Sequence, residues 1–144
     1  MKLIKIVLGV LVLLLIYASG SVAGDFDWMK DFSIKAEADQ SGFKARLSTR
    51  FKIGNAEINA VISHVDNSAD AYMVLRLGEM SGKPIEEVVK KYKSSKGKGW
   101  GALAKSLGIK PGSKEFHALK NGDDLYGKER KVKVKGKDKG KKKK

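Results

Sequence analysis

His64 and His117 are the two histidines of this 144-residue chain, and cysteine is absent. Metal sites on helices commonly pair ligands at H-x-x-x-H or H-E-x-x-H spacing, which places both side chains on one face. Neither histidine has such a partner, although Glu115, Asp123 and Asp124 lie close to His117 in sequence. We therefore expect no metal site and interpret His117 as a partly buried helical residue with a hydrogen-bonded ring nitrogen.

Paired carboxylates are a second chemistry that the sequence could supply. A glycan-cleaving enzyme needs two carboxyl groups flanking the scissile bond, and the candidates are Glu79, Glu86, Glu87 and Glu115. Acids near the start of a helix stabilise its dipole, and nothing in the sequence sets two of these glutamates apart from that role. Serine paired with histidine as nucleophile and base is equally unsupported. We expect no catalytic residues and a protein that is not an enzyme; a cell-wall hydrolase is the least favoured alternative.

The segment Gly97–Ala102 matches the loose pattern G-x-G-x-x-[GA] of dinucleotide-binding loops. Such a loop must join a buried strand to a helix, so that backbone N–H groups meet the pyrophosphate. Here a lysine-rich helix is expected to precede the segment. We interpret the glycines as a hinge between helices and expect no cofactor.

The last seventeen residues, 128–144, hold most of the net charge of +14. Glu129 and Asp138 oppose eleven cations there, so this tail carries +9 while residues 24–127 carry only +3. A segment so charged cannot offset the entropy of ordering itself, and we expect it to be disordered. Its charge density favours unspecific binding of anionic surfaces or polyanions. The expected anion-binding residues are Lys128, Arg130, Lys131, Lys133, Lys135, Lys137, Lys139, Lys141, Lys142, Lys143 and Lys144.

A second, weaker group of cations precedes Trp100. Five lysines at the end of one helix and in the following loop could extend an anion-binding surface, or could be the cations that favour an ordinary helix C-terminus. Trp100 itself heads an apolar stripe, which indicates a core residue. These hinge lysines are Lys90, Lys91, Lys93, Lys96 and Lys98.

Residues 1–23 resemble a secretory signal peptide. Lys2 and Lys5 precede the apolar run Ile6–Ile16, and Ser21-Val22-Ala23 has the small-x-small form of a cleavage site. A retained membrane anchor is the alternative, but an anchor needs about 20 apolar residues. We expect a protein exported to the periplasm or beyond and possessing no disulfide, so its apolar core alone must hold the fold.

Residues 24–127 show the apolar periodicity of helices. Phe43, Leu47 and Phe51 predict a helix from Ser41 to Lys52. In residues 24–40 apolar and polar residues alternate as in a strand, although Trp28 and Phe32 are one helical turn apart. We expect this segment to form an extended or partly helical arm that packs its aromatic side chains on the domain. Similar spacing predicts further helices over 55–65, 68–81, 84–93, 100–107 and 113–121.

Capping residues support these boundaries. We expect N-caps at Asn55, within the run Asp66-Asn67-Ser68 and at Ser113, Pro84 at the first helical position, and a stop at Ser81-Gly82. In the helix 68–81, Tyr72 and Arg76 are expected near the rim of the core. The predicted fold is all-α: a small bundle of about five to six short helices over residues 24–127, with an N-terminal arm and a disordered basic C-terminal tail.

The run GWGALAKSLGIKPGSKEFHALK, with AYMVLRLGEMSGKPIEEVVKKYKSSKGK before it, resembles a family of uncharacterised small exported bacterial proteins. The likeness covers residues 31–121 and rests on a GWGxxAKxLGIxPGSxEFHxLK signature. It implies export but no activity and no catalytic residues. Residues 85–109 separately resemble a helix-turn-helix, which implies DNA.

Together these observations predict an exported, non-enzymatic binding or structural domain of the cell envelope. The tail is expected to meet an anionic surface and the body an unknown protein partner, with no small-molecule substrate identified. A nucleic-acid-binding module of the helix-turn-helix type is the main alternative.

Overall fold

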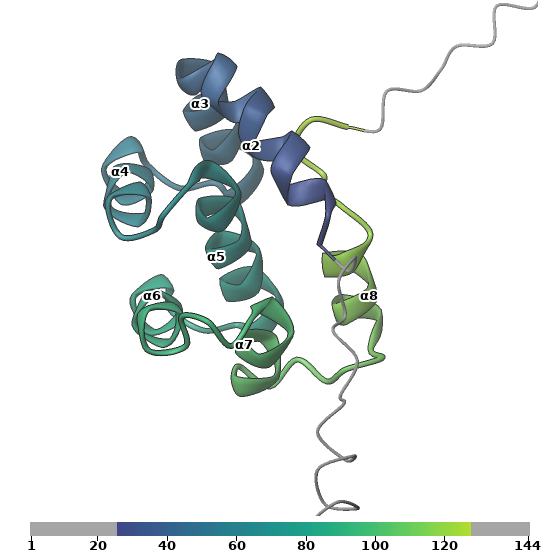
Figure 1. Ribbon diagram of the computed structural model, residues 1–144. Helices are drawn as coiled ribbons and strands as arrows, with labels where there is room; N and C mark the ends of the chain where they lie inside the picture. Colours follow the sequence, from purple (N-terminus) through teal and green to yellow (C-terminus); the bar gives the residue numbers. More distant parts are fainter. Residues whose placement is uncertain (1–25, 128–144) are drawn as a thin grey trace, which may run out of the picture.

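The computed structural model describes residues 26–127, and within that range it contains seven helices and no strand (Figure 1). The expected signal peptide at 1–23 and the basic tail at 128–144 lie outside the described residues. The all-α fold class is confirmed, while the expected number of five to six helices is too low. The helices are α2 Trp28–Ala38, α3 Gln40–Phe51, α4 Asn55–Ser63, α5 Ser68–Ser81, α6 Ile85–Ser94, α7 Trp100–Ser106 and α8 Lys114–Lys120.

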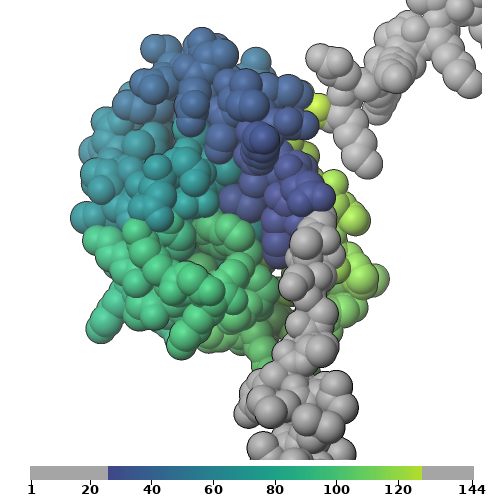
Figure 2. All heavy atoms as spheres, viewed as in Figure 1, coloured from purple at the N-terminus to yellow at the C-terminus, as the bar shows by residue number. Residues whose placement is uncertain are grey.

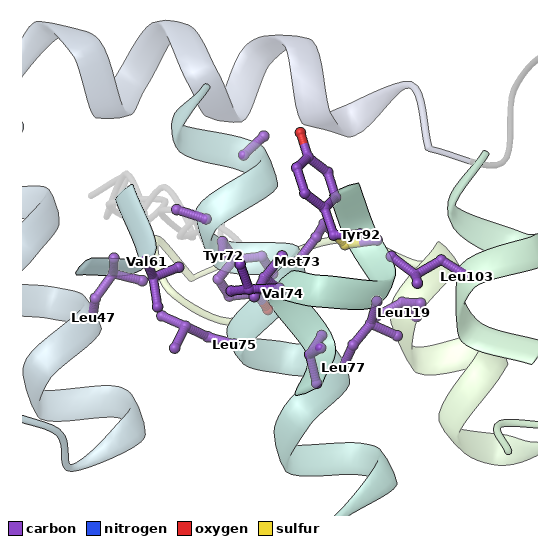
Figure 3. Packing of buried hydrophobic residues seen from close by; sticks show 14 of the residues in the cluster. Leu47, Val61, Tyr72, Met73, Val74, Leu75, Leu77, Tyr92, Leu103 and Leu119 are labelled. Carbon is purple, nitrogen blue, oxygen red and sulfur yellow. The ribbon is translucent and has the colours of Figure 1, made fainter. Parts of the chain in front are cut away.

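Helix α5 occupies the centre of the bundle and packs against α2, α3, α4 and α6 (Figure 1). Every residue from Ala69 to Leu75 is buried, as are Leu77 and Gly78, so the first two turns of the helix are covered on all sides. A helix buried all round needs small or apolar residues on every face. Gly78 fits closely against α6, because an added Cβ would lie 2.7 Å from Cδ1 of Ile85. Apolar side chains from α3, α4, α6, α7 and α8 meet those of α5 in the core (Figure 3).

The additional helix is α2, which replaces the extended or partly helical arm expected over residues 24–40. Phe32 and Ala36, one helical turn apart, are its buried residues, whereas Ile34 is 58% exposed. The alternation of apolar and polar residues that suggested a strand is therefore coincidental. The expectation that the aromatic residues of this segment pack on the domain is confirmed, because the Phe32 ring makes edge contacts with Trp28, Phe43 and Tyr126.

Most helix boundaries follow the expected capping residues. The Asn67 side chain accepts a hydrogen bond from the backbone N–H of Asp70 at 2.9 Å, and Ser113 accepts one from Phe116. Gly82 ends α5 with a φ of 65°, a left-handed conformation that glycine adopts without a steric penalty. Two predictions are off by one residue, since Gly54 rather than Asn55 is the N-cap of α4 and Pro84 is the N-cap rather than the first residue of α6.

Tyr72 was expected at the rim but is 1% exposed, so that prediction is wrong. Its hydroxyl donates a hydrogen bond to Oδ1 of Asp124 at 2.9 Å and accepts one from the Asp124 backbone N–H at 3.1 Å. Arg50 donates to the other oxygen of Asp124 and to both oxygens of Glu79, at 2.8–2.9 Å. Arg76 completes this group, which we call the C-terminal clasp, with a 2.6 Å contact to Glu79.

The clasp perturbs the acids that form it. Burial raises the pKa of Asp124, but hydrogen bonds from Arg50 and Tyr72 outweigh it and hold the pKa below the ordinary value of 3.8. Hydrogen bonding to Arg50 likewise lowers the pKa of Glu79 below 4.5. A depressed carboxyl pKa stabilises the fold above the unfolded pKa, and this stability is lost as the pH falls through the folded value.

We predict that Asp124→Asn lowers the free energy of unfolding at pH 7 by about 1 kcal/mol, because it removes the negative charge that pairs with Arg50. The loss is no larger because solvent screens part of this interaction. The effect should shrink below pH 4, where the wild-type carboxyl also becomes protonated. Urea unfolding at pH 7 and below pH 4 measures the effect. The variant Glu37→Gln, at an exposed position on α2, is the control. Equal stability of the Asp124 variant and wild type at pH 7 would contradict a stabilising clasp.

Candidate functional site

A small hollow lies where the start of α5, the end of α6 and the start of α7 meet. Its volume is about 170 Å³, and its polar lining comes from Asp66, Asp70, Tyr92 and Lys96. Trp100 and Leu103 of α7 supply the apolar lining. We call it the α6–α7 hollow. The space-filling view shows the α6–α7 segment, in green, packed below the α4–α5 region (Figure 2).

Two carboxylates converge on one hydroxyl group in the hollow. The Tyr92 hydroxyl lies 2.7 Å from Oδ2 of Asp70 and 3.2 Å from Oδ2 of Asp66. It also accepts a hydrogen bond from the Asp66 backbone N–H at 3.4 Å. A phenol carries a single proton and donates it to one acceptor at a time. The shorter distance indicates that Asp70 receives this proton, which leaves Asp66 to be satisfied by another group.

Lys96 supplies that group. Its Nζ atom donates to Oδ1 of Asp66 at 2.7 Å and lies 5.7 Å from the centre of the Tyr92 ring. The ring of Trp100 stacks on the ring of Tyr92, with 5.5 Å between the ring centroids and an angle of 24° between the planes. Trp100 is half-buried rather than a full core residue, because it forms part of the wall of the hollow.

The loop between α6 and α7 forms the rim of the hollow. Gly97 and Gly99 have φ values of 85° and 84°, a region that side-chain-bearing residues rarely adopt. The glycine pattern at 97–102 therefore joins two helices, as the hinge interpretation predicts, and not a strand to a helix.

The two acids of the hollow have opposite electrostatic environments. Asp70 is the one buried charged residue among residues 26–127, at 8% exposure, and burial raises its pKa. The hydrogen bond from Lys96 lowers the pKa of Asp66. Burial also raises the pKa of Tyr92, which stays protonated at neutral pH. Environments that separate the pKa values of neighbouring groups are a common feature of functional sites.

The five hinge lysines do not form one surface. Lys90 and Lys93 border an apolar groove between α4 and α6, in which Lys93 Nζ lies 3.0 Å from Nδ1 of His64. Lys91 donates to the Ser106 carbonyl on α7 at 3.3 Å. Lys96 is paired with Asp66, and Lys98 is exposed on the loop. The expected anion-binding residues of the tail lie outside the described residues.

The remaining candidates occupy separate places. Glu86 and Glu87 lie in the first turn of α6 and Glu115 in that of α8, as their capping interpretation predicts. Glu79 belongs to the C-terminal clasp instead. The interpretation of His117 as partly buried is wrong, because the residue is exposed on α8.

Asp66 and Asp70 were not identified as site residues from the sequence. Asp66 lies in the break before α5, where an Asp-Asn-Ser run is typical of a helix N-cap, and Asp70 lies in the first turn of α5. The signal in the sequence was spacing: Asp66 and Asp70 are four residues apart, and Tyr92, Lys96 and Trp100 follow one another at intervals of four residues. Only Tyr92 lies on α6, whereas Lys96 lies in the following loop and Trp100 begins α7. This spacing therefore neither places the three on one helical face nor reveals which acids face them.

Two kinds of feature are absent from residues 26–127. None of the helices in this range has the length and apolarity to cross a membrane. Nor does the range contain a group of three or more histidine, aspartate or glutamate side chains placed to hold a metal ion.

Comparison of the chain with protein-family models, curated proteins and solved structures found no match. The resemblance to small exported bacterial proteins therefore stays a prediction.

We predict that Asp70→Asn stabilises the protein at pH 7. An acid with a raised folded pKa favours the fold most at low pH, and that contribution is lost as the pH rises through the folded pKa. Removing the buried charge should raise the free energy of unfolding by about 0.5–1 kcal/mol after allowance for solvent screening. The gain should disappear at pH 3.

Asp66→Asn is the matched comparison, since it should destabilise the protein by removing the partner of Lys96. Urea titrations of both variants at the two pH values measure these effects. Loss of stability in the Asp70 variant at pH 7 would mean that the interaction of the ionised acid with the α5 N-terminus outweighs its burial.

Proposed function

We propose that the protein is an exported, non-enzymatic binding domain of the cell envelope, held on an anionic surface by residues 128–144. The observation that carries this proposal is the separation of charge along the chain. Residues 128–144 carry a net charge of +9, whereas residues 24–127 carry +3. The helical body is therefore close to neutral, and attraction to a polyanion is concentrated in the tail.

The physical strength of such a tail is considerable. Each lysine or arginine close to an anionic membrane contributes up to about 1 kcal/mol, and the attraction falls off within a Debye length. Eleven cations can therefore hold the protein at a surface without a folded binding site. The same mechanism makes retention strongly dependent on salt.

The attachment of the tail to the body supports this function. Residues 123–127 lie against α2 and α3, where the Tyr126 ring meets Phe32 at 5.2 Å and the guanidinium of Arg46 at 5.3 Å. Asp124 is held by the C-terminal clasp. The cationic residues therefore follow directly on a segment that is fixed to the body beside α2 and α3.

The second candidate is a nucleic-acid-binding module. It is favoured by the α6–α7 pair, two contacting helices joined by a short loop, which has the plan of a helix-turn-helix. Lys98 and Lys105 are exposed on this pair. A polyanion bound by the tail alone would not need them.

We predict that replacing all eleven cations of 128–144 by glutamine reduces retention on vesicles containing 30% anionic phospholipid at least tenfold at low salt. The reason is the loss of the summed electrostatic attraction. Sedimentation with the vesicles measures retention, and the wild-type protein should be released as salt is added. A variant with the ten tail lysines changed to arginine is the matched control and should be retained like wild type.

Equal retention of the glutamine variant and wild type would refute the tail as an anchor. A parallel titration with duplex DNA separates the alternative. Binding of DNA by the glutamine variant that is lost on Lys98→Gln with Lys105→Gln would favour the helix-turn-helix module.

Export makes its own prediction. The mature protein recovered from the envelope or medium of expressing bacteria should begin at Gly24, because Ser21-Val22-Ala23 precedes it as a cleavage site. Mass spectrometry of the intact protein measures the N-terminus. A cytoplasmic chain that still begins at Met1 would contradict export.

A further inference from the structure

We infer that the α6–α7 hollow is a binding site for a primary ammonium group at the end of an alkyl chain, the group that ends a lysine side chain or a polyamine. The inference is independent of the proposed anchoring by the tail. It rests on the charge, the aromatic walls and the resident lysine of the hollow.

The charge of the hollow is the first argument. Asp66 and Asp70 bring two carboxyl groups to a single phenol proton, and Lys96 brings one cation, which is committed to Asp66. Asp70 is 92% removed from solvent by burial and has no cation within salt-bridge distance among the described residues. A buried acid whose hydrogen bonds come from neutral donors gains from the close approach of a cation.

Aromatic rings form the second argument. Tyr92 and Trp100 both line the hollow, and their rings stack on one another. Aromatic faces attract ammonium groups through the ring quadrupole, and sites that combine such faces with carboxylates recognise cationic ligands. Leu103 adds an apolar contact for the methylene groups that carry the charge.

Lys96 provides the third argument, because an ammonium group already binds at the entrance. Its Nζ atom contacts Asp66 at 2.7 Å and the Tyr92 ring at 5.7 Å, while its side chain is 52% exposed. The hollow of about 170 Å³ that Asp70 and Trp100 line stays open beside it. A water molecule takes up about 30 Å³ in the liquid, so an ammonium group with several methylenes fits this space. Lys96 therefore competes with an incoming ammonium group for the carboxylate of Asp66.

Tryptophan fluorescence tests the site directly. The chain has two tryptophans, so Trp28→Phe leaves Trp100 as the single reporter at the hollow. We expect a saturable change in Trp100 emission on titration with 1,5-diaminopentane and none with 1,5-pentanediol, which has the same chain without charge. Circular dichroism checks that the variant keeps its helical content.

Substitutions in this background define the mechanism. Asp70→Asn should weaken binding at least tenfold, because it removes the carboxylate that has no cationic partner within salt-bridge distance while the fold stays intact. Lys96→Gln should tighten binding about threefold by removing the internal competitor. Lys98→Gln, on the same loop but outside the lining of the hollow, is the matched control and should leave the affinity unchanged.

The inference is overturned if the diamine and the diol act alike, or if Lys96→Gln weakens binding, since Lys96 would then be part of the site and not a competitor. The variant with glutamines throughout 128–144 identifies the source of the ammonium group. Tighter diamine binding by that variant than by wild type assigns the hollow to lysines of the chain's own tail, and equal binding assigns it to an external amine. Retention on vesicles is a separate measurement, so failure of either proposal leaves the other testable.

Discussion

The burial of the first two turns of α5 on every side is the constraint on which this structure depends. These turns have no surface at which polar side chains can be left to water, so each polar group they carry needs a partner inside the protein. Tyr72 finds Asp124 from the C-terminal segment, and Asp70 finds Tyr92 from α6. The C-terminal clasp and the α6–α7 hollow are therefore two solutions to the same problem, set two residues apart on one helix.

The C-terminal clasp and the α6–α7 hollow differ in how completely their charged side chains are neutralised. In the clasp, Arg50 and Arg76 face Glu79 and Asp124, and each acid accepts hydrogen bonds from a guanidinium or hydroxyl group. In the hollow, one lysine faces two acids. Balanced networks hold structure together, whereas an unbalanced one beside an open cavity is a feature of sites that bind something. This contrast, more than any single residue, distinguishes the hollow from ordinary packing.

Much of the fold could be predicted from local patterns. Helix α6 carries proline before it, acids in its first turn and an apolar stripe through Val88, Val89 and Tyr92, and the structure agrees at nearly every position. Helix α2 was missed because its apolar residues fit both a period of two and one helical turn, and only the packing of Phe32 against Phe43 and Tyr126 decides between them. Tyr72 was misplaced for a similar reason, since its partner lies 52 positions away.

The candidate site was less predictable than the fold. Clustered lysines are visible in any sequence, but their pairing is not, and Lys96 proves to be neutralised by Asp66. Asp66 and Asp70 matter because the chain turns between α4 and α5, and both carboxyl groups then lie beside the Tyr92 hydroxyl. Contacts between separate helices of this kind depend on tertiary packing that no local spacing encodes.

The contact between Tyr126 and Phe32 joins nearly the last described residue to α2, the first helix of residues 26–127. Since a ribosome makes a protein from its N-terminus, the aromatic cluster around Phe32 stays unfinished until almost the whole body has been synthesised. A nascent chain that stops before residue 124 would leave the Tyr72 hydroxyl without Asp124 and one side of Phe32 uncovered. Completion of the fold is in this way coupled to completion of the polypeptide, and partly made chains remain open to chaperones and proteases.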